Sequence, residues 1–150
     1  QQTLQGMAQG KTVDELAEQI ALPAHLQSLP YLEEHYGTVS WSVRGIFAGY
    51  MGWFDGNPTN LNPLPVKQQA ENMLRMMGGA EPVCTEINQA LQNQQYQWVL
   101  QLCDILLNSQ QNVQQARQYK AHAMTALAEL ETSSNGRHYY LCCAKALLEA

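Results

Sequence analysis

The sequence predicts an all-α fold, arranged as an antiparallel array of helices. Apolar residues recur at three- and four-residue spacing along most of the chain, which is the period of an amphipathic helix. No segment alternates between apolar and polar residues for long enough to form a strand. Charged residues make up only 14% of the 150 residues, and glutamine, a good helix former, supplies much of the polar surface. We therefore expect one helical domain over residues 1–150.

A capping box predicts the first well-defined helix. The Thr12 hydroxyl can accept a hydrogen bond from a first-turn amide while Glu15 reaches back to the amide of Thr12. Pro23 is expected to follow the end of this helix, and Pro30 interrupts the next short segment. The apolar face of the helix consists of Val13, Leu16, Ala17 and Ile20.

A second amphipathic helix is expected from Thr38 to about Met51. It contains two internal glycines, Gly45 and Gly49, and each weakens the helix by about 1 kcal/mol relative to alanine. Glycines at such positions predict the close approach of another backbone. The apolar positions of this helix are Val39, Val43, Phe47, Tyr50 and Met51.

Residues 53–65 form the most unusual stretch of the chain. Two bulky aromatic residues, Trp53 and Phe54, stand beside Asp-Gly and Asn-Pro turn dipeptides and three prolines. Proline lowers the entropy that a loop must lose on ordering, so we expect a fixed loop pinned onto neighbouring structure. Loop anchoring is assigned to Phe54, Asp55, Gly56, Asn57, Pro58 and Asn60.

The second half predicts successive helices joined by short connections. Pro65 is placed like a helix-starting proline, and Gly78-Gly79 marks the end of that helix. The last three helices are expected to be antiparallel neighbours, similar to tetratricopeptide helix pairs although the full repeat signature is not met. The helices after Gly79 are expected over about 81–93, 96–108, 112–130 and from near 136 onward.

The chain carries no pattern that predicts a catalytic or metal site. A net charge of −5 without a basic cluster argues against a nucleic-acid partner, and no apolar run reaches the roughly 18 residues that span a membrane. No two histidines have metal-ligand spacing, and His122 is expected to be partly buried and neutral. Serine-nucleophile, phosphate-binding and dinucleotide motifs are absent from the sequence. The four histidines are His25, His35, His122 and His138.

The cysteines show no Cys-x-x-Cys spacing, and each lies in a helical pattern. We expect free thiols that are buried as small apolar side chains. A disulfide is the alternative interpretation, and a metal site is not expected. The four cysteines are Cys84, Cys103, Cys142 and Cys143.

The aromatic group around the second helix has two interpretations. The first is that its rings belong to the core and anchor the loop; the second is that some of them line an apolar cavity shared with another domain. Arg44 is the cation of this neighbourhood, and Asp55 is its expected partner in a structural ion pair. The group consists of Trp41, Phe47, Tyr50, Trp53 and Phe54.

Two strings in this region resemble a known family. The run from Tyr36 to Ser40 (Tyr-Gly-Thr-Val-Ser) and the run from Tyr50 to Pro58 (Tyr-Met-Gly-Trp-Phe-Asp-Gly-Asn-Pro) are similar to the central domain of the alkyl sulfatases. Those enzymes are zinc-dependent sulfate-ester hydrolases built on a metallo-β-lactamase fold. The resemblance extends over nearly all 150 residues, through the Gly78-Gly79 break and into the helix that begins at Tyr96.

The resemblance implies that this chain is the middle, all-α dimerisation domain of a longer protein. An N-terminal catalytic domain would hold two zinc ions, and a C-terminal domain would resemble sterol-carrier proteins. The chain would then carry no catalytic residue and no metal ligand, and its partners would be a second copy and the catalytic domain of the same chain. A lining role at the substrate pocket is implied for Tyr36, Trp41, Arg44, Tyr50 and Trp53.

One position departs from the family pattern. The family has Ser-His-Asn-Val where this chain has the run from Ser40 to Val43, so Trp41 replaces a histidine that is expected to protonate the leaving group. An indole cannot act as a general acid near neutral pH. The exact reaction and substrate of the parent protein therefore stay open, as does its compartment; a periplasmic or secreted parent is one option.

Two functions are weighed from these observations. The first is a dimerisation and pocket-lining domain of an alkylsulfatase-like hydrolase, which predicts an apolar dimer interface above about 2,000 Å². The second is a stand-alone helical-repeat adaptor that binds a peptide in a groove, which predicts a stable monomer. Autonomous catalysis by this chain is not expected.

Overall fold

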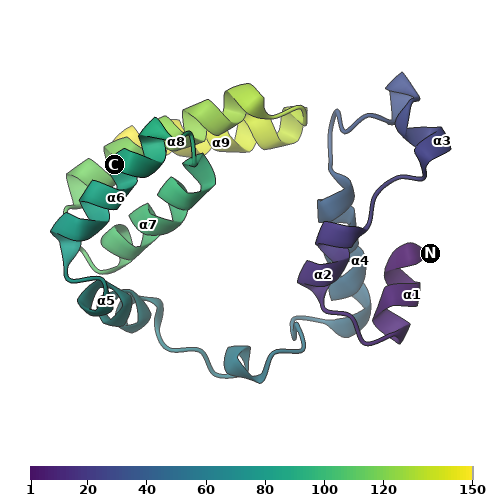
Figure 1. Ribbon diagram of the computed structural model, residues 1–150, viewed down its shortest axis with the longest axis horizontal. Coiled ribbons are helices and arrows are strands. Elements are labelled where there is room, and N and C mark those ends of the chain that lie inside the picture. The colour runs from purple at the N-terminus through teal and green to yellow at the C-terminus, as the bar shows by residue number, and fades with distance from the viewer. Residues whose placement is uncertain (150) are drawn as a thin grey trace. The chain divides into compact units, whose positions relative to one another are not determined.

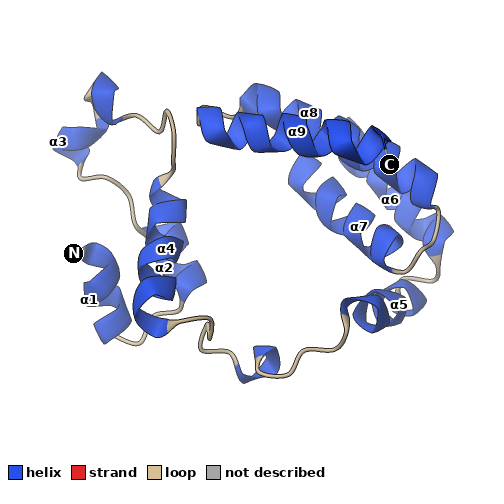
Figure 2. Cartoon of the chain, turned by 180° about the vertical axis from the view of Figure 1, so that it is seen from behind, coloured by secondary structure: helices blue, strands red, loops and turns tan. Residues whose placement is uncertain are grey.

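The computed structural model describes residues 1–149, and over that range it contains helices and no strand (Figures 1 and 2). The all-α prediction is therefore confirmed. Ala150, the last residue of the expected domain, lies outside the described residues. The chain divides into two compact units, the first formed by residues 1–63 with 132–135 and the second by 64–131 with the residues from 136 onward. A single domain over residues 1–150 stays a prediction.

The first unit contains the short helices of the chain. The capping box is confirmed, because Thr12 Oγ1 accepts from the Glu15 amide at 3.3 Å and Glu15 Oε2 accepts from the Thr12 amide at 2.8 Å. Both α1 and α2 pack against α4, whose first turn is capped by Thr38. The elements are α1 (Gln2–Ala8), α2 (Val13–Gln19), α3 (Ala24–Gln27), the 3-10 turn η1 (Pro30–Leu32), α4 (Val39–Met51) and the 3-10 turn η2 (Pro58–Asn60).

The core of the first unit is small. Only Leu16, Val43 and Phe47 are buried hydrophobic side chains in its described residues, and they hold α2 against α4. Val43 and Phe47 are one helical turn apart, so they share one face of α4. The partly buried residues around them are Met7, Val13, Ala17, Ile20 and Val39.

The second unit is built around α7. This helix packs against α5, α6 and α8, and the pairing with α8 is the most extensive. Figure 2 labels these helices. The helices are α5 (Val66–Met76), α6 (Ala80–Gln92), α7 (Tyr96–Asn108), α8 (Val113–Leu130) and α9 (Ser134–Glu149). Each begins within two residues of its predicted start. The tetratricopeptide-like character of these helices stays a prediction.

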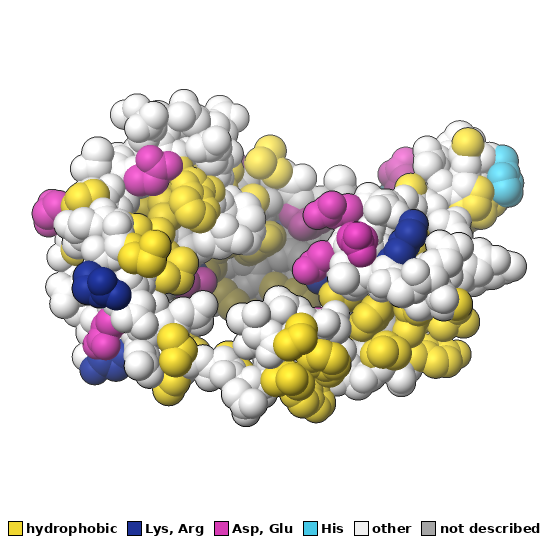
Figure 3. Space-filling model, turned by 60° about the horizontal axis from the view of Figure 1, so that its bottom comes forward, with side chains coloured by type: hydrophobic (Ala, Val, Ile, Leu, Met, Phe, Trp, Pro, Cys, Tyr) yellow, Lys and Arg dark blue, Asp and Glu magenta, His cyan; other side chains and the backbone are white. Residues whose placement is uncertain are grey.

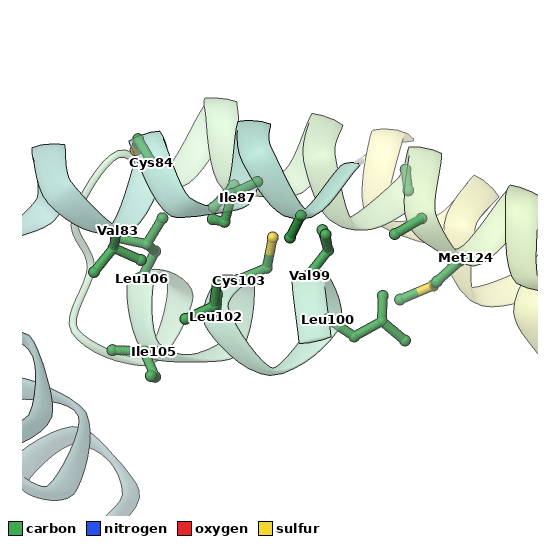
Figure 4. Close-up of a cluster of buried hydrophobic side chains, with 14 of the residues drawn as sticks. Val83, Cys84, Ile87, Val99, Leu100, Leu102, Cys103, Ile105, Leu106 and Met124 are labelled. Atoms are coloured by element: carbon green, nitrogen blue, oxygen red, sulfur yellow. The ribbon is translucent and has the colours of Figure 1, made fainter. Parts of the chain in front are cut away.

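A continuous apolar core fills the second unit (Figure 4). Its centre is α7, whose buried side chains Val99, Leu102 and Leu106 belong to the same cluster as Ile87 of α6. Between α5 and α6, Gly78 and Gly79 adopt φ values of +86° and +105°, which explains why two glycines end α5. This core is several times larger than that of the first unit.

Several burial predictions are wrong. His122 is exposed on α8, where partial burial was expected, because the buried face of that helix consists mainly of alanines. Cys84 and Cys103 are buried as free thiols, as predicted, whereas Cys142 and Cys143 are free but exposed. The two lie on α9, which buries only Gly136 and Ala144 among its described residues. All four cysteines lie in a helical sequence pattern, and that pattern did not distinguish the buried cysteines from the exposed ones.

The glycines of α4 do not face another backbone within the described chain. A Cβ built at Gly45 or Gly49 would meet no atom within 4 Å. The prediction that another backbone of this chain approaches Gly45 and Gly49 is therefore wrong for the described residues. The two positions lie on the solvent side of α4, away from Val43 and Phe47.

Candidate interaction site

The aromatic residues of the predicted site are mostly exposed. The exposed fraction is 43% for Trp41, 70% for Tyr50 and 74% for Trp53, whereas Phe47 is buried in the first unit. Phe47 therefore belongs to the core, as the first interpretation expects, whereas Trp41, Tyr50 and Trp53 do not. Anchoring of the loop by these rings stays a prediction. Phe54 is half-buried and makes an edge-to-face contact with Trp53, with ring centroids 6.0 Å apart.

The geometry of α4 separates the predicted pocket-lining residues. Trp41 and Arg44 are three positions apart and lie on neighbouring parts of one helix side. Tyr50 is nine positions from Trp41, and at about 100° per residue this places the two side chains on opposite sides of α4. Tyr36 lies before the helix and is as exposed as Trp53. Within the described chain these residues do not converge on one cavity.

Arg44 pairs with Asp14 and not with Asp55. The Arg44 Nη1 atom donates to Asp14 Oδ1 at 2.8 Å, which links α4 to α2. Both side chains are at least half exposed, so the pair contributes little beyond orientation. The predicted Arg44–Asp55 pair is wrong because both Asp55 oxygens are occupied by bonds within the loop.

Asp55 organises the loop that follows α4. One of its carboxylate oxygens accepts the Asn57 amide at 2.8 Å, and the other accepts the Asn60 side-chain amide. Asn57 Oδ1 in turn accepts the Thr59 amide at 3.1 Å and opens the 3-10 turn η2. Hydrogen bonds from the Asn57 amide, and then from Asn60, lower the pKa of the Asp55 carboxyl below its ordinary value of 3.8. The carboxylate therefore holds this turn in one conformation by bonds to its own loop.

The backbone favours glycine at two bends of this region. Gly52 ends α4 with φ of +74°, and Gly56 continues the loop with φ of +93°. Residues that carry a side chain rarely adopt these backbone angles, so both positions favour glycine. The chain direction after α4 is thus fixed by Gly52, Gly56 and the bonds to Asp55.

A cavity of about 730 Å³ lies on the first unit and overlaps a second cavity of about 520 Å³. None of Tyr36, Trp41, Arg44, Tyr50 or Trp53 lines either of them. Both are lined by apolar side chains and an acidic pair, a combination that sequence reasoning missed. The residues common to both are Ile20, Ala21, Leu22, Leu32, Glu33, Glu34 and Val39.

The signal for this cavity is present in the sequence but is indirect. Pro23 and Pro30 prevent one continuous helix from forming between α2 and α4, so apolar residues on either side of them cannot share a helical face. Glu34 is fixed at the rim because its Oε1 atom accepts the Val39 amide at 2.6 Å. A proline-interrupted apolar segment beside a capped helix predicts such a hollow.

The described residues contain no group of three or more His, Cys, Asp or Glu side chains that could hold a metal ion. His35 is exposed, with Nε2 3.0 Å from the Pro30 carbonyl oxygen and 3.9 Å from Glu33. His138 lies 3.3 Å from Cys142 on α9, and these two form a pair without a third ligand. Among residues 1–149, no helix is both long and apolar enough to cross a membrane.

Comparison with known families assigns this all-helical chain to one of them. The sequence model for alkyl sulfatase dimerisation matches residues 12–150. The chain belongs to the alkyl sulfatase dimerisation family. The resemblance seen in the sequence is therefore confirmed.

Known alkylsulfatases share this domain. A linear primary-alkylsulfatase from a Pseudomonas species is 37% identical over 147 residues, which are 97% of this chain and 28% of that protein. An alkyl/aryl-sulfatase from Saccharomyces cerevisiae is 34% identical over 140 residues, 93% of this chain and 22% of that protein. The chain thus spans about a quarter of the length of these relatives.

Solved structures show the same fold. A double mutant of the secondary alkylsulfatase PisA1 matches with a TM-score of 0.90 at 31% identity, over 97% of this chain and 23% of that one. The stereoselective inverting secondary alkylsulfatase Pisa1 from a Pseudomonas species matches with a TM-score of 0.83 at 30% identity, over 98% of this chain and 23% of that one. The helical domain described above is therefore a segment found within larger alkylsulfatases.

Proposed function

We propose that this chain forms a homodimer and serves as the dimerisation domain of a larger sulfate-ester hydrolase. The observation that carries the proposal is the small core of the first unit beside its many exposed apolar side chains. Three buried hydrophobic residues contribute only about 2 kcal/mol each, which is little for a unit of this size. Other apolar surface must therefore be covered by a second polypeptide for the unit to be stable.

The exposed apolar residues supply such a surface. Figure 3 shows apolar side chains gathered in patches on one face of the chain. The exposed large apolar residues of the first unit include Trp41, Ile46, Tyr50, Met51 and Trp53, all on α4 or directly after it. Isolated exposed apolar residues are ordinary on protein surfaces. Large apolar side chains on both sides of one short helix leave α4 without cover within the described chain, and such exposure indicates contact with another polypeptide.

Dimerisation is tested by the dependence of stability on protein concentration. A dimer that covers these side chains is stabilised by mass action, so the thermal midpoint of the chain rises when its concentration is raised from about 1 to 100 µM. A monomeric adaptor of the helical-repeat type gives the same midpoint at both concentrations. A constant midpoint together with a monomeric mass would refute the proposal.

Catalysis by the parent protein is assigned to residues outside this chain. We propose that a zinc pair is held by an N-terminal catalytic domain of the same chain and that a sterol-carrier-like domain follows at the C-terminal side. The described residues do not fit a metal, since no group of three potential ligands occurs among them. The lengths of the relatives, of which this chain covers 22–28%, support a parent several times longer.

We propose further that the exposed aromatic corner lines the substrate pocket of the parent. The proposed lining residues are Tyr36, Trp41, Arg44, Tyr50 and Trp53. The turn organised by Asp55 holds the loop after α4 against the neighbouring polypeptide. Their exposure in the described chain supports contact with another polypeptide or with substrate. Because Trp41 and Tyr50 lie on opposite sides of α4, the two would contact different walls or different partners.

The pocket assignment is tested in the full-length parent protein. Trp41→Ala is expected to raise KM for an alkyl sulfate ester, because it removes an apolar contact surface of the bound chain. Tyr139→Ala is the matched control, since Tyr139 is a similarly exposed aromatic residue on α9 of the second unit. Equal effects of the two substitutions on KM would contradict the assignment.

A further inference from the structure

The segment Thr132–Asn135, which joins α8 to α9 and includes the first two residues of α9, makes two hydrogen bonds to the turn that precedes α4. The Ser133 hydroxyl donates to the Tyr36 carbonyl oxygen at 2.7 Å, and the Ser134 amide donates to the His35 carbonyl oxygen at 2.7 Å. The paired residues are 97 and 99 positions apart in the sequence, so no local preference of the chain brings them together. Residues 132–135 accordingly belong to the first compact unit.

Ser133 is fully buried, with an exposed fraction of 0%. A buried hydroxyl is retained at low cost only when it is hydrogen-bonded, and its removal leaves the carbonyl partner without that donor. The Tyr36 carbonyl therefore depends on a side chain from a distant segment. This arrangement is specific to serine or a residue that can donate in the same direction.

The same connection also lines the smaller cavity of the first unit. Thr132 stands in its wall together with Glu34, His35 and Val39. Thr132 directly precedes Ser133, and His35 supplies the carbonyl oxygen that the Ser134 amide bonds. At its other end the connection is tight, because a Cβ at Gly136 would come within 2.9–3.0 Å of the Glu131 side chain.

We infer that the Thr132–Asn135 connection acts as a strap that fixes the His35–Tyr36–Gly37 turn, and that Ser133 is the positioning residue for Tyr36. The strap holds the backbone of the turn through carbonyl oxygens, which leaves the Tyr36 side chain free to project outward. Its role in the parent protein rests on the proposed function, in which Tyr36 lines the substrate pocket.

Amide hydrogen exchange of the 150-residue chain tests the strap. Ser133→Ala removes the donor to Tyr36, and the loss of one hydrogen bond between neutral groups corresponds to roughly five- to tenfold faster exchange of the Ser134 amide, which bonds the same turn. Exchange at the amides of α7 is expected to stay unchanged. Uniform acceleration over both units would mean that Ser133 only adds general stability, and no acceleration would mean that the strap does not exist; either result overturns the inference.

Ser109→Ala is the matched control for this substitution. Ser109 is also buried, and its hydroxyl donates to the carbonyl oxygens of Ile105 and Leu106 at the end of α7. Its removal is expected to speed exchange at that helix end and to leave the Ser134 amide unaffected. The control therefore separates loss of a buried serine hydroxyl from loss of the strap.

A second measurement in the full-length parent separates the strap from the proposed pocket. Ser133→Ala is expected to raise KM for a sulfate ester while kcat is unchanged, and Ser109→Ala to change neither. Local acceleration of Ser134 exchange with an unchanged KM would keep the strap and refute the pocket role of Tyr36. A raised KM without local acceleration would refute the strap.

Discussion

Two glycines in helices of the first unit are expected to respond to the same substitution with opposite signs. Gly6 in α1 and Gly45 in α4 both have ordinary helical backbone angles, so alanine gains about 1 kcal/mol of helix propensity at either position. The surroundings differ. A Cβ at Gly45 would meet no atom within 4 Å, whereas a Cβ at Gly6 would lie 2.2 Å from a terminal methyl of Leu16.

The magnitude follows from that one contact. Ordinary carbon–carbon contact is about 3.5–4.0 Å, so Leu16 must move by more than 1 Å to accommodate the new methyl group. Leu16 is fully buried in the core of the first unit, and overpacking of such a site costs about 1–3 kcal/mol. Because the gain in helix propensity is common to both variants, the free energy of unfolding of Gly6→Ala should be lower than that of Gly45→Ala by about 1–3 kcal/mol.

Urea denaturation at fixed protein concentration, followed by circular dichroism, measures this difference. Gly45→Ala is expected to be more stable than the unmodified chain by about 1 kcal/mol, and Gly6→Ala to be no more stable than the unmodified chain. If Gly6→Ala proves as stable as Gly45→Ala, the close approach of Gly6 to the Leu16 side chain is wrong.

Two further predictions follow from burial and hydrogen bonding. With an aromatic disulfide reagent at pH 8, Cys142 and Cys143 should react quickly, whereas Cys84 and Cys103 should react only on unfolding. Burial protects Cys84 and Cys103 from the reagent and raises the pKa of Cys103 to about 12. Rapid reaction of all four thiols in the folded chain would contradict the core. The Asp55 carboxyl should titrate below 3.8 by NMR, because its bonds to the Asn57 amide and to Asn60 favour the charged form. A lowered folded-state pKa means that this contribution is present above the unfolded pKa and is lost as pH falls through the folded one. Asn60→Ala should move the Asp55 pKa back toward 3.8, and titration of the unmodified chain at or above 3.8 would contradict the loop geometry.

Helix periodicity and capping signals predicted most of the fold. The capping box at Thr12, the Thr38–Met51 helix and the Gly78-Gly79 break all lie where the sequence indicated, since these features depend on residues within a few positions of one another. The short elements α3, η1 and η2 were not predicted. Pieces of three or four residues carry too few apolar positions to show a period.

Contacts between distant segments were much harder to predict. Arg44 was assigned to Asp55, eleven positions away, but bonds Asp14, which is 30 positions away on α2. The Asp55 oxygens were already satisfied by Asn57 and Asn60, a local arrangement that the Asp-Gly-Asn-Pro string contains but that was interpreted only as a turn. The bond from Ser133 to Tyr36 has no local signal at all.

The candidate site was predicted by residue type more successfully than by geometry. The sequence identified Trp41, Tyr50 and Trp53 as unusual, and they are indeed the large exposed side chains around α4. It could not give their directions, because a helix of thirteen residues presents side chains on all sides and the buried side is set by α2. The cavity beside Glu34 was missed for the same reason.

The mass of the chain in solution tests the proposed homodimer most directly. Sedimentation equilibrium at about 1–100 µM should give twice the chain mass of 16.8 kDa, since the exposed apolar surface of the first unit requires a partner. A mass of 16.8 kDa across that whole range would contradict the account.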